Sequence, residues 1–165
     1  MFTTTSCRPG LVFGSVVLAL SMWVPGDVRA QEAVVTEDVD SAVREAAGAF
    51  VRAFNDLDWG AFEASWAEDA TAFFPVPGSD RRVEGREAVV GLFRQLFADF
   101  PEREPGPPYL SIDPLDVHVQ ATGGMAIVSF HLGDAPPYNR RTLVFEKRGD
   151  RWLIVHLHAS RGLEG

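Results

Sequence analysis

The apolar residues of this 165-residue chain change their spacing once, and this change restricts the fold more than any other feature. Up to about residue 100 they recur every three or four positions, which is typical of the buried face of a helix. From Leu115 onward they alternate with polar residues, which is typical of a strand with one buried face. Helices followed by strands indicate an α+β domain, with three N-terminal helices packed on a strongly curved antiparallel sheet of four to six strands.

Three helices are predicted before the strands. The first runs from an N-cap at Thr36 to about Asn55, and the third from Arg86 to about Phe100. Both have an apolar stripe along one side. Each should therefore bury one face against the sheet.

The second predicted helix is short and aromatic. Asp58 caps its first turn, and Glu68-Asp69 ends it. Phe62 and Trp66 lie four residues apart and therefore on one face. The predicted strands are residues 71–75, 115–120, 125–132, 140–147 and 151–160.

The last predicted strand, residues 151–160, sorts its side chains onto two faces. Val155, Leu157 and Ala159 form an apolar face, which we expect to lie under the helices. His156 and His158 stand on the opposite face, which is free to contact a partner subunit.

The first thirty residues have the features of a secretory signal peptide. Arg8 precedes an apolar run, Leu11–Val24, and Val28-Arg29-Ala30 has the small residues of a cleavage site. The run is an alternative membrane anchor, but at the helical rise it spans only about 21 Å of a ~30 Å hydrocarbon core. We therefore predict a signal peptide over residues 1–30, a short tail over 31–37, the folded domain over 38–162, and an exported protein, periplasmic or extracellular, without a stable anchor.

Cysteine content and charge exclude several functions. Cys7, the one cysteine of the sequence, lies within the predicted signal peptide, so the mature chain has no disulfide, thiol nucleophile or zinc–thiolate site. The net charge of −8, with no basic run, argues against binding nucleic acid or an anionic membrane. No cofactor is indicated.

Several short motifs occur in a family-specific order. They are Asp58–Phe62, Thr71–Pro75, Val83–Gly85, Val117–Val119, and Thr142–Ser160 with its Val-His-Leu-His-Ala-Ser end. In this order they resemble the nuclear-transport-factor-2-like superfamily, in its SnoaL-like branch, and the association (hub) domain of calcium/calmodulin-dependent kinases. The resemblance covers about residues 38–162.

The resemblance implies a cone-shaped cavity between the sheet and the helices, and a homodimer formed through the outer face of the sheet. In the hub domain the cavity holds small carboxylates through a tyrosine, a histidine and arginines. Carried over by position, the tyrosine falls on Phe62 and the histidine on Val89. The arginines fall on His131, Leu143 and Ala159, so this chain departs from the hub pattern.

From the resemblance and the apolar pattern, we expect the cavity to bind a small, mainly apolar ligand. Arg141, two residues before Leu143, is expected to meet an acidic group at the rim or to be a solvated strand end. The predicted pocket residues are Phe62, Trp66, Val89, Phe93, His131, Arg141, Leu143, Phe145 and Ala159.

His131 is the candidate catalytic residue. A histidine in an apolar cleft can act as general acid or base near neutral pH, and dehydratases of this superfamily use a cavity histidine in this way. The alternative is a single polar group that closes the cavity mouth, hydrogen-bonded to Tyr138 or water. The sequence leaves open whether the protein is an enzyme.

His156 and His158 have two interpretations. Together with His118 they resemble the ligand spacing of a metal site. Histidines on a dimer face more often hydrogen-bond across the interface, and we therefore predict a dimer contact and no metal.

Acidic residues are weaker candidates for a catalytic base of the steroid-isomerase kind, which needs a buried carboxylate with a raised pKa. Asp58 is explained by helix capping, Asp69 by a helix end and Asp116 by a solvent-facing strand position. Three functional hypotheses follow: a ligand-binding dimer, an isomerase, dehydratase or cyclase that uses His131, and a structural hub without a ligand.

Overall fold

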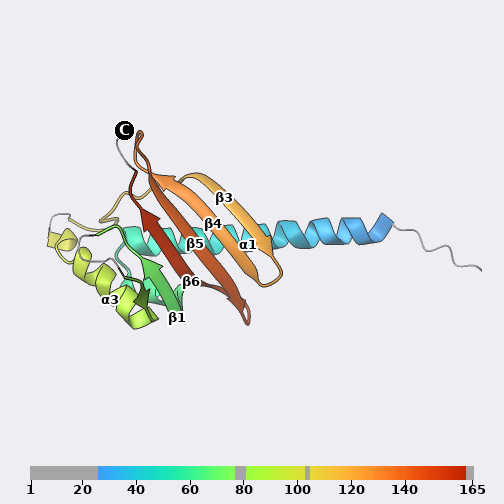
Figure 1. The fold of residues 1–165 in the computed structure, drawn as a ribbon, viewed down its shortest axis with the longest axis horizontal. Coiled ribbons are helices and arrows are strands. Elements are labelled where there is room, and N and C mark those ends of the chain that lie inside the picture. Colours follow the sequence, from blue (N-terminus) through green and yellow to red (C-terminus); the bar gives the residue numbers. More distant parts are fainter. Residues whose placement is uncertain (1–25, 77–80, 103–104, 163–165) are drawn as a thin grey trace, which may run out of the picture.

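The structure is a computed structural model that describes residues 26–76, 81–102 and 105–162. Its helices are α1 (Gly26–Asn55), α2 (Trp59–Ala64), α3 (Arg86–Leu96) and the short 3₁₀ helix η1 (Phe100–Glu102). Its strands are β1 (Trp66–Phe73), β2 (Val83–Glu84), β3 (Leu115–Thr122), β4 (Met125–Leu132), β5 (Asn139–Arg148) and β6 (Arg151–Ser160). In Figure 1 the sheet lies in front, α1 crosses behind it, and α3 lies beside β1. The predicted α+β class is confirmed.

The described strands form one sheet in the order β2-β1-β6-β5-β4-β3. Strands β3 to β6 are an antiparallel meander, as predicted, but β1 pairs with β6 in parallel, so the sheet is mixed. A parallel pair needs a long connection. Here α3 and strands β3 to β5 lie between the two strands in the sequence.

The first helix starts earlier than predicted. It begins at Gly26, so Thr36 lies inside α1 and is not its N-cap. The intervening residues 29–33 are strong helix formers, and no proline or glycine interrupts them. The predicted boundary of the domain at residue 38 is therefore not marked by a helix end.

The second helix ends earlier than predicted. It stops at Ala64, and Trp66 is the first residue of β1. The carbonyl of Ser65 accepts a hydrogen bond from the Ile154 amide of β6 at 2.9 Å, and Trp66 pairs with Ile154. Sheet pairing therefore overrides the helical spacing of Phe62 and Trp66.

A β-bulge in β6 changes which residues face the helices. Val144 of β5 pairs with His156 while Phe145 pairs with Ile154, so Val155 is the extra residue. Leu157 and Ala159 lie on the inner face as predicted, but Ile154, rather than Val155, continues that face and is fully buried. The bulge thus shifts the alternation by one residue.

The inner face of the sheet packs against the apolar stripes of α1 and α3. On α1 the buried residues recur at helical spacing: Val43, Ala47, Phe50 and Phe54. Their aromatic rings contact those of α2, β1 and α3, with Phe62 at 5.1 Å from Phe50 and 4.9 Å from Phe93 between ring centroids. None of the helices in the described part of the chain combines the length and apolar character of a membrane span.

Candidate functional site

A pocket of about 280 Å³ lies where α1 and α3 meet the inner face of the sheet. Four phenylalanines from these elements and from the end of β1 form its aromatic wall: Phe54, Phe74, Phe93 and Phe97. Leu132, Leu157 and Ala159 form the wall on the sheet side. The polar side chains among its described lining residues are Asn139, Arg141 and Arg161.

The rings of the aromatic wall pack edge to face. The centroid of Phe54 lies 5.1 Å from that of Phe93 and 4.9 Å from that of Phe97, both nearly perpendicular, and Phe74 meets Phe93 at 5.1 Å. Phe54 and Phe93 are also buried, with 8% and 7% of their surface exposed. The wall is therefore continuous with the core, and its surface is preformed for an apolar group.

The predicted pocket residues divide into three groups. Phe93, Arg141 and Ala159 line the pocket. Five others are fully buried in the core and do not line it: Phe62, Trp66, Val89, Leu143 and Phe145. His131 lies on the other face of the sheet.

The prediction that His131 faces the cavity is wrong. On β4 the residues Ala126, Val128 and Phe130 are buried, and β4 pairs with β5 without a bulge, so His131 points to the outer face. Its side chain is 39% exposed, its Nδ1 lies 3.8 Å from Asp116 Oδ2, and its ring packs on Tyr138 at 5.7 Å. It therefore has no contact with the pocket and is not a catalytic candidate there.

Arg141 is the half-buried cation of the pocket. It lies on the inner face of β5, and its Nη1 donates hydrogen bonds to the carbonyl oxygens of Arg140 at 2.8 Å and Ser160 at 3.3 Å. Burial lowers the pKa of the Arg141 guanidinium from its ordinary value. Among the ion pairs of the described residues, none includes Arg141.

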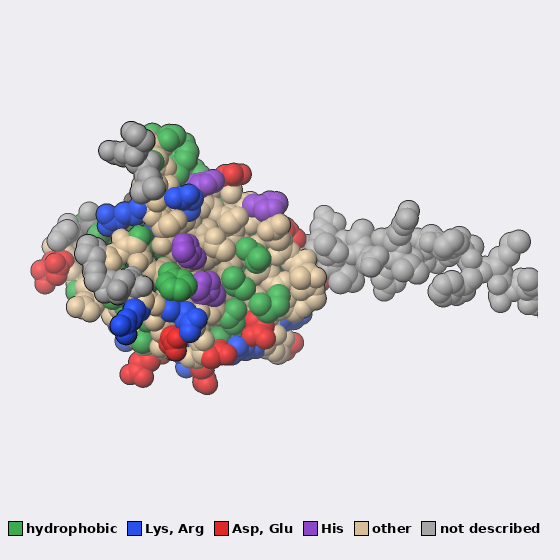
Figure 2. All heavy atoms as spheres, viewed as in Figure 1, with side chains coloured by type: hydrophobic (Ala, Val, Ile, Leu, Met, Phe, Trp, Pro, Cys, Tyr) green, Lys and Arg blue, Asp and Glu red, His purple; other side chains and the backbone are tan. Residues whose placement is uncertain are grey.

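All four histidines of the chain lie on the outer face of the sheet. His118, on β3, pairs with Ser129, and Thr142 pairs with His158, so these residues form one row across the strands. His156 belongs to the next row. Figure 2 shows this face, with the histidine side chains spread around hydrophobic ones. The position of His156 and His158 agrees with the predicted outer face, whereas the dimer contact stays a prediction.

The three histidines of the metal alternative are not brought together. Two strands, β5 and β4, lie between His158 on β6 and His118 on β3, a separation of about 14 Å at the usual strand spacing. In the described part of the chain, no three histidine or acidic side chains are grouped closely enough for a metal ion.

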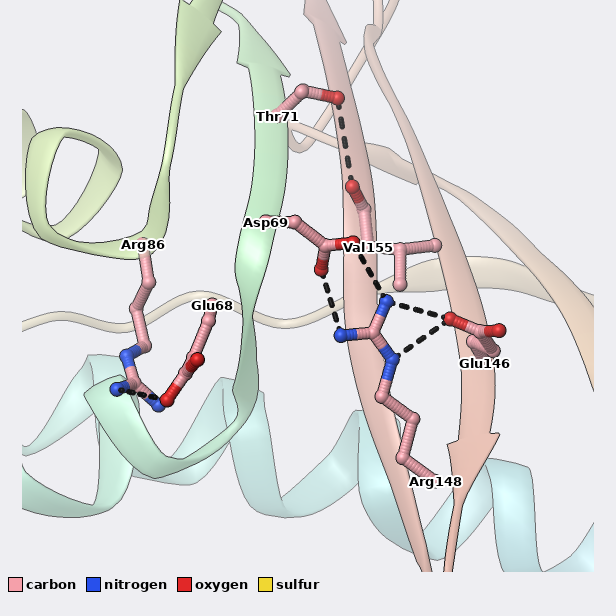
Figure 3. A network of polar contacts seen from close by, with 7 residues as sticks. All are labelled: Glu68, Asp69, Thr71, Arg86, Glu146, Arg148 and Val155. Atoms are coloured by element: carbon pink, nitrogen blue, oxygen red, sulfur yellow. Dashed lines mark hydrogen bonds and ion pairs between the residues drawn. The ribbon is translucent and has the colours of Figure 1, made fainter.

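The acidic candidates have structural partners. Asp58 Oδ1 accepts the Ala61 amide at 3.0 Å and caps α2, as predicted. Asp69, in the irregular part of β1, forms an ion pair with Arg148 at 2.7 Å, and Arg148 also contacts Glu146 on its own strand (Figure 3). Hydrogen bonding from Arg148 lowers the pKa of Asp69. None of these carboxylates lines the pocket.

Sequence reasoning missed the loop that bounds the pocket near Ile112. Asn55, the last residue of α1, holds this loop: its side chain exchanges hydrogen bonds with the backbone of Ile112 at 2.9 and 3.0 Å. Its carbonyl also accepts the amides of Tyr109 and Leu110. An asparagine at a helix end is a common capping residue. Its partner here lies more than fifty residues away, and nothing in the sequence around Asn55 indicates that partner. The inward position of Asn139, in contrast, can be predicted from the same alternation along the strand that places Arg141 inward.

The fold and the pocket together define a class: an α+β domain in which helices pack on one face of a mixed sheet and a mainly apolar pocket lies between them. The chain belongs to the SnoaL-like domain family, whose model matches residues 43–164. This confirms the resemblance seen in the sequence motifs. No curated protein sequence is detectably similar to the chain.

Solved structures support the same fold. A candidate dehydratase of the NTF2-like family from Streptomyces avermitilis is 23% identical with a TM-score of 0.64, covering 78% of this chain and 99% of that one. An NTF2-like protein of unknown function from Pseudomonas putida is 21% identical, with a TM-score of 0.62 and coverage of 75% and 87%. The CaMKII hub of S. rosetta is 24% identical, with a TM-score of 0.56 and coverage of 73% and 95%. At these identities the similarity establishes the fold alone.

Proposed function

We propose that this chain is an exported SnoaL-like domain protein that binds a small, mainly apolar ligand in the pocket between α3 and the sheet, and that it does so as a homodimer. The observation that carries the proposal is the pocket itself. Its aromatic wall and its leucines offer a preformed apolar surface, and its volume of about 280 Å³ lies at the small end of ligand sites.

The polar groups of the pocket favour binding over acid–base catalysis. They are the amide of Asn139 and the guanidinium groups of Arg141 and Arg161, and neither kind of group is an ordinary general base near neutral pH. His131, the residue expected to supply one, lies on the outer face.

The experiment that tests ligand binding is native mass spectrometry of protein purified gently from its source. We expect a retained small molecule that is displaced by an apolar aromatic compound. Titration of the purified protein with such a compound gives the affinity directly. Absence of both a retained molecule and saturable binding would contradict the proposal.

The proposed homodimer uses the outer face of the sheet. Phe73, Met125 and Ile127 expose 37–41% of their surface on this face. Figure 2 shows hydrophobic side chains on the same face as the histidines. Burying them against a second copy would remove this apolar area from water. Light scattering of the wild-type protein should give the mass of a dimer. Ile127→Lys should give a monomer. The control Ala49→Lys, on an exposed part of α1, should leave the dimer intact. A wild-type monomer at micromolar concentration would refute this part.

The proposed export rests on the apolar run and cleavage pattern of residues 1–30. Cleavage after Ala30 would leave α1 from Gln31 onward, together with every strand of the described sheet. We expect the protein in the periplasmic or extracellular fraction with Gln31 as its N-terminal residue, which N-terminal sequencing checks.

A further inference from the structure

We propose that the ligand of this pocket is a small aryl or alkyl carboxylic acid, whose carboxylate binds the free edge of the Arg141 guanidinium and whose apolar body lies against the phenylalanine wall. This inference rests on the proposed function and names its ligand class. It concerns a residue outside the positions that the hub resemblance assigns to carboxylate binding.

The geometry of Arg141 points to an anion. A guanidinium has five N–H donors in a planar fork. Both hydrogen bonds of Arg141 to described residues, to the carbonyls of Arg140 and Ser160, use Nη1. The edge formed by Nε and Nη2 is therefore left without a partner in the described residues, and this is an edge that can bind a carboxylate through two parallel hydrogen bonds.

The free edge is accessible rather than sealed in the core. Among the described residues, Trp66 Nε1 alone is a fully buried side-chain polar atom without a partner. The free donors of Arg141 therefore retain accessible surface, and Arg141 lines the pocket. The two carbonyls that hold Nη1 fix the plane of the guanidinium, which reduces the entropy lost when a ligand binds.

The charge around the pocket is opposite to that of the whole protein. The chain has 23 acidic residues and a net charge of −8, yet the described lining residues include two arginines and no carboxylate. A half-buried cation without a counter-charge is unfavourable, and burial lowers the pKa of Arg141 for this reason. An acidic ligand would supply the missing charge.

A second cation is held at the exposed end of the same pocket. Arg161 follows β6, and its carbonyl accepts a hydrogen bond from Arg140 Nη2 at 3.1 Å. The next residue, Gly162, packs so closely on Pro137 that a Cβ would lie 2.6 Å from the proline Cβ. This contact fixes the backbone beside Arg161, whose side chain lines the same pocket as Arg141.

The size and lining of the pocket define the rest of the ligand. With about 280 Å³ and a wall of four phenylalanines, the pocket suits one ring or a short branched chain. The arrangement therefore favours a monocarboxylate with one apolar group over a dicarboxylate or a sugar acid, whose other polar groups would meet aromatic rings.

The test compares 3-phenylpropionate with its neutral amide, 3-phenylpropanamide, by isothermal titration calorimetry. We expect the wild-type protein to bind the acid at least tenfold more tightly than the amide, because the acid makes charge-assisted, paired hydrogen bonds. Arg141→Gln should bring this ratio close to one, chiefly by weakening the binding of the acid. Lys147→Gln is the matched control: it changes an exposed cation of the same strand that does not line the pocket, and it should keep the ratio.

Equal binding of acid and amide by the wild-type protein would overturn the inference and leave the proposed apolar pocket standing. A ratio that survives Arg141→Gln would also overturn it. Binding of neither probe would contradict the proposed function as well. A readout that needs no variant is the ¹⁵N-resolved Nε–H signal of Arg141, which should shift on adding the acid and not on adding the amide.

Discussion

The Oγ1 atom of Thr71 and the Nδ1 atom of His156 lie 2.8 Å apart across the parallel pair of β1 and β6. The ring of Phe73 packs edge-on against the same imidazole, with 5.8 Å between centroids. His156 is therefore half-buried within the outer face. Burial lowers its pKa, and the nearby charges of His158 and Arg82 lower it further.

The first prediction concerns the titration of His156. NMR titration of the imidazole protons should give His156 a pKa below its ordinary value of about 6.5. Since the folded-state pKa lies below the unfolded one, this histidine contributes stability above that ordinary value, and the contribution is lost as pH falls through the window between the two pKa values. His156→Gln should remove this part of the pH dependence of Tm.

The variant Arg82→Gln tests how much of the lowered pKa of His156 comes from nearby charge. It removes one of the positive charges that oppose protonation of His156, so the pKa of His156 should rise toward its ordinary value. Titration of His156 at or above that value in the wild-type protein would contradict its burial.

The second prediction concerns a variant whose larger side chain fills the pocket. Ala159→Leu adds three carbon atoms to the sheet-side wall and should lower the affinity for an apolar probe at least tenfold, because the added side chain occupies the space of the ligand. The matched control is Ile154→Val on the same strand, which is fully buried but does not line the pocket. It should cost about 0.5–1.5 kcal/mol of unfolding free energy and leave the affinity unchanged. Equal loss of affinity in both variants would indicate that the probe binds elsewhere.

The third prediction concerns the loop held by Asn55. Asn55→Ala removes both side-chain hydrogen bonds to Ile112 and should cost about 1–3 kcal/mol in urea unfolding. Because Ile112 lines the pocket, ligand affinity should fall as well. Asn55→Asp keeps the acceptor for the Ile112 amide and loses the donor, so its effect should be smaller. An Asn55→Ala variant with wild-type stability would show that the loop is held by other contacts.

The fourth prediction concerns acid stability. Arg148 donates to Asp69 and Glu146, and its hydrogen bond lowers the pKa of Asp69 below the ordinary value of 3.8 (Figure 3). The stability that this pair contributes is present above that value and is lost as pH falls through the lowered pKa. Asp69→Asn should therefore reduce Tm at neutral pH and flatten its decline below pH 4. Glu68→Gln, which breaks a looser contact of 3.7 Å with Arg86, should change Tm less.

Helices and strands were predicted well where the spacing of apolar residues was regular and where a nearby residue capped the helix. The hairpin of β3 and β4, the strand Arg151–Ser160 and the Asp58 cap all agree with the structure because each depends on neighbouring residues. The placement of Trp66 failed because pairing with Ile154, 88 positions away, outweighs the helical spacing.

The candidate site was harder to predict for two physical reasons. The bulge at Val155 shifts the alternation of inner and outer side chains in β6 by one residue. No residue type in that strand indicates a bulge. His131 was carried to the cavity by positional resemblance, whereas the burial of Val128 and Phe130 on the same strand fixes it on the outer face. Arg141 was placed beside Leu143 by alternation alone, and that prediction agrees with the structure because β4, β5 and their pairing are regular between these residues.

The position of β6 between β1 and β5 governs the order in which the domain is built during synthesis. The ribosome makes β1 about eighty residues before β6, and β1 has no partner in the meander until β6 emerges. A nascent chain that lacks residues 151–160 can form the β3–β5 meander, but it cannot complete the wall around the aromatic residues of α1 and α3. Closure therefore comes only after residue 160 has been made, and long-range pairing of this kind is slow. A chain that stays open this long is available for threading through a narrow channel before it folds.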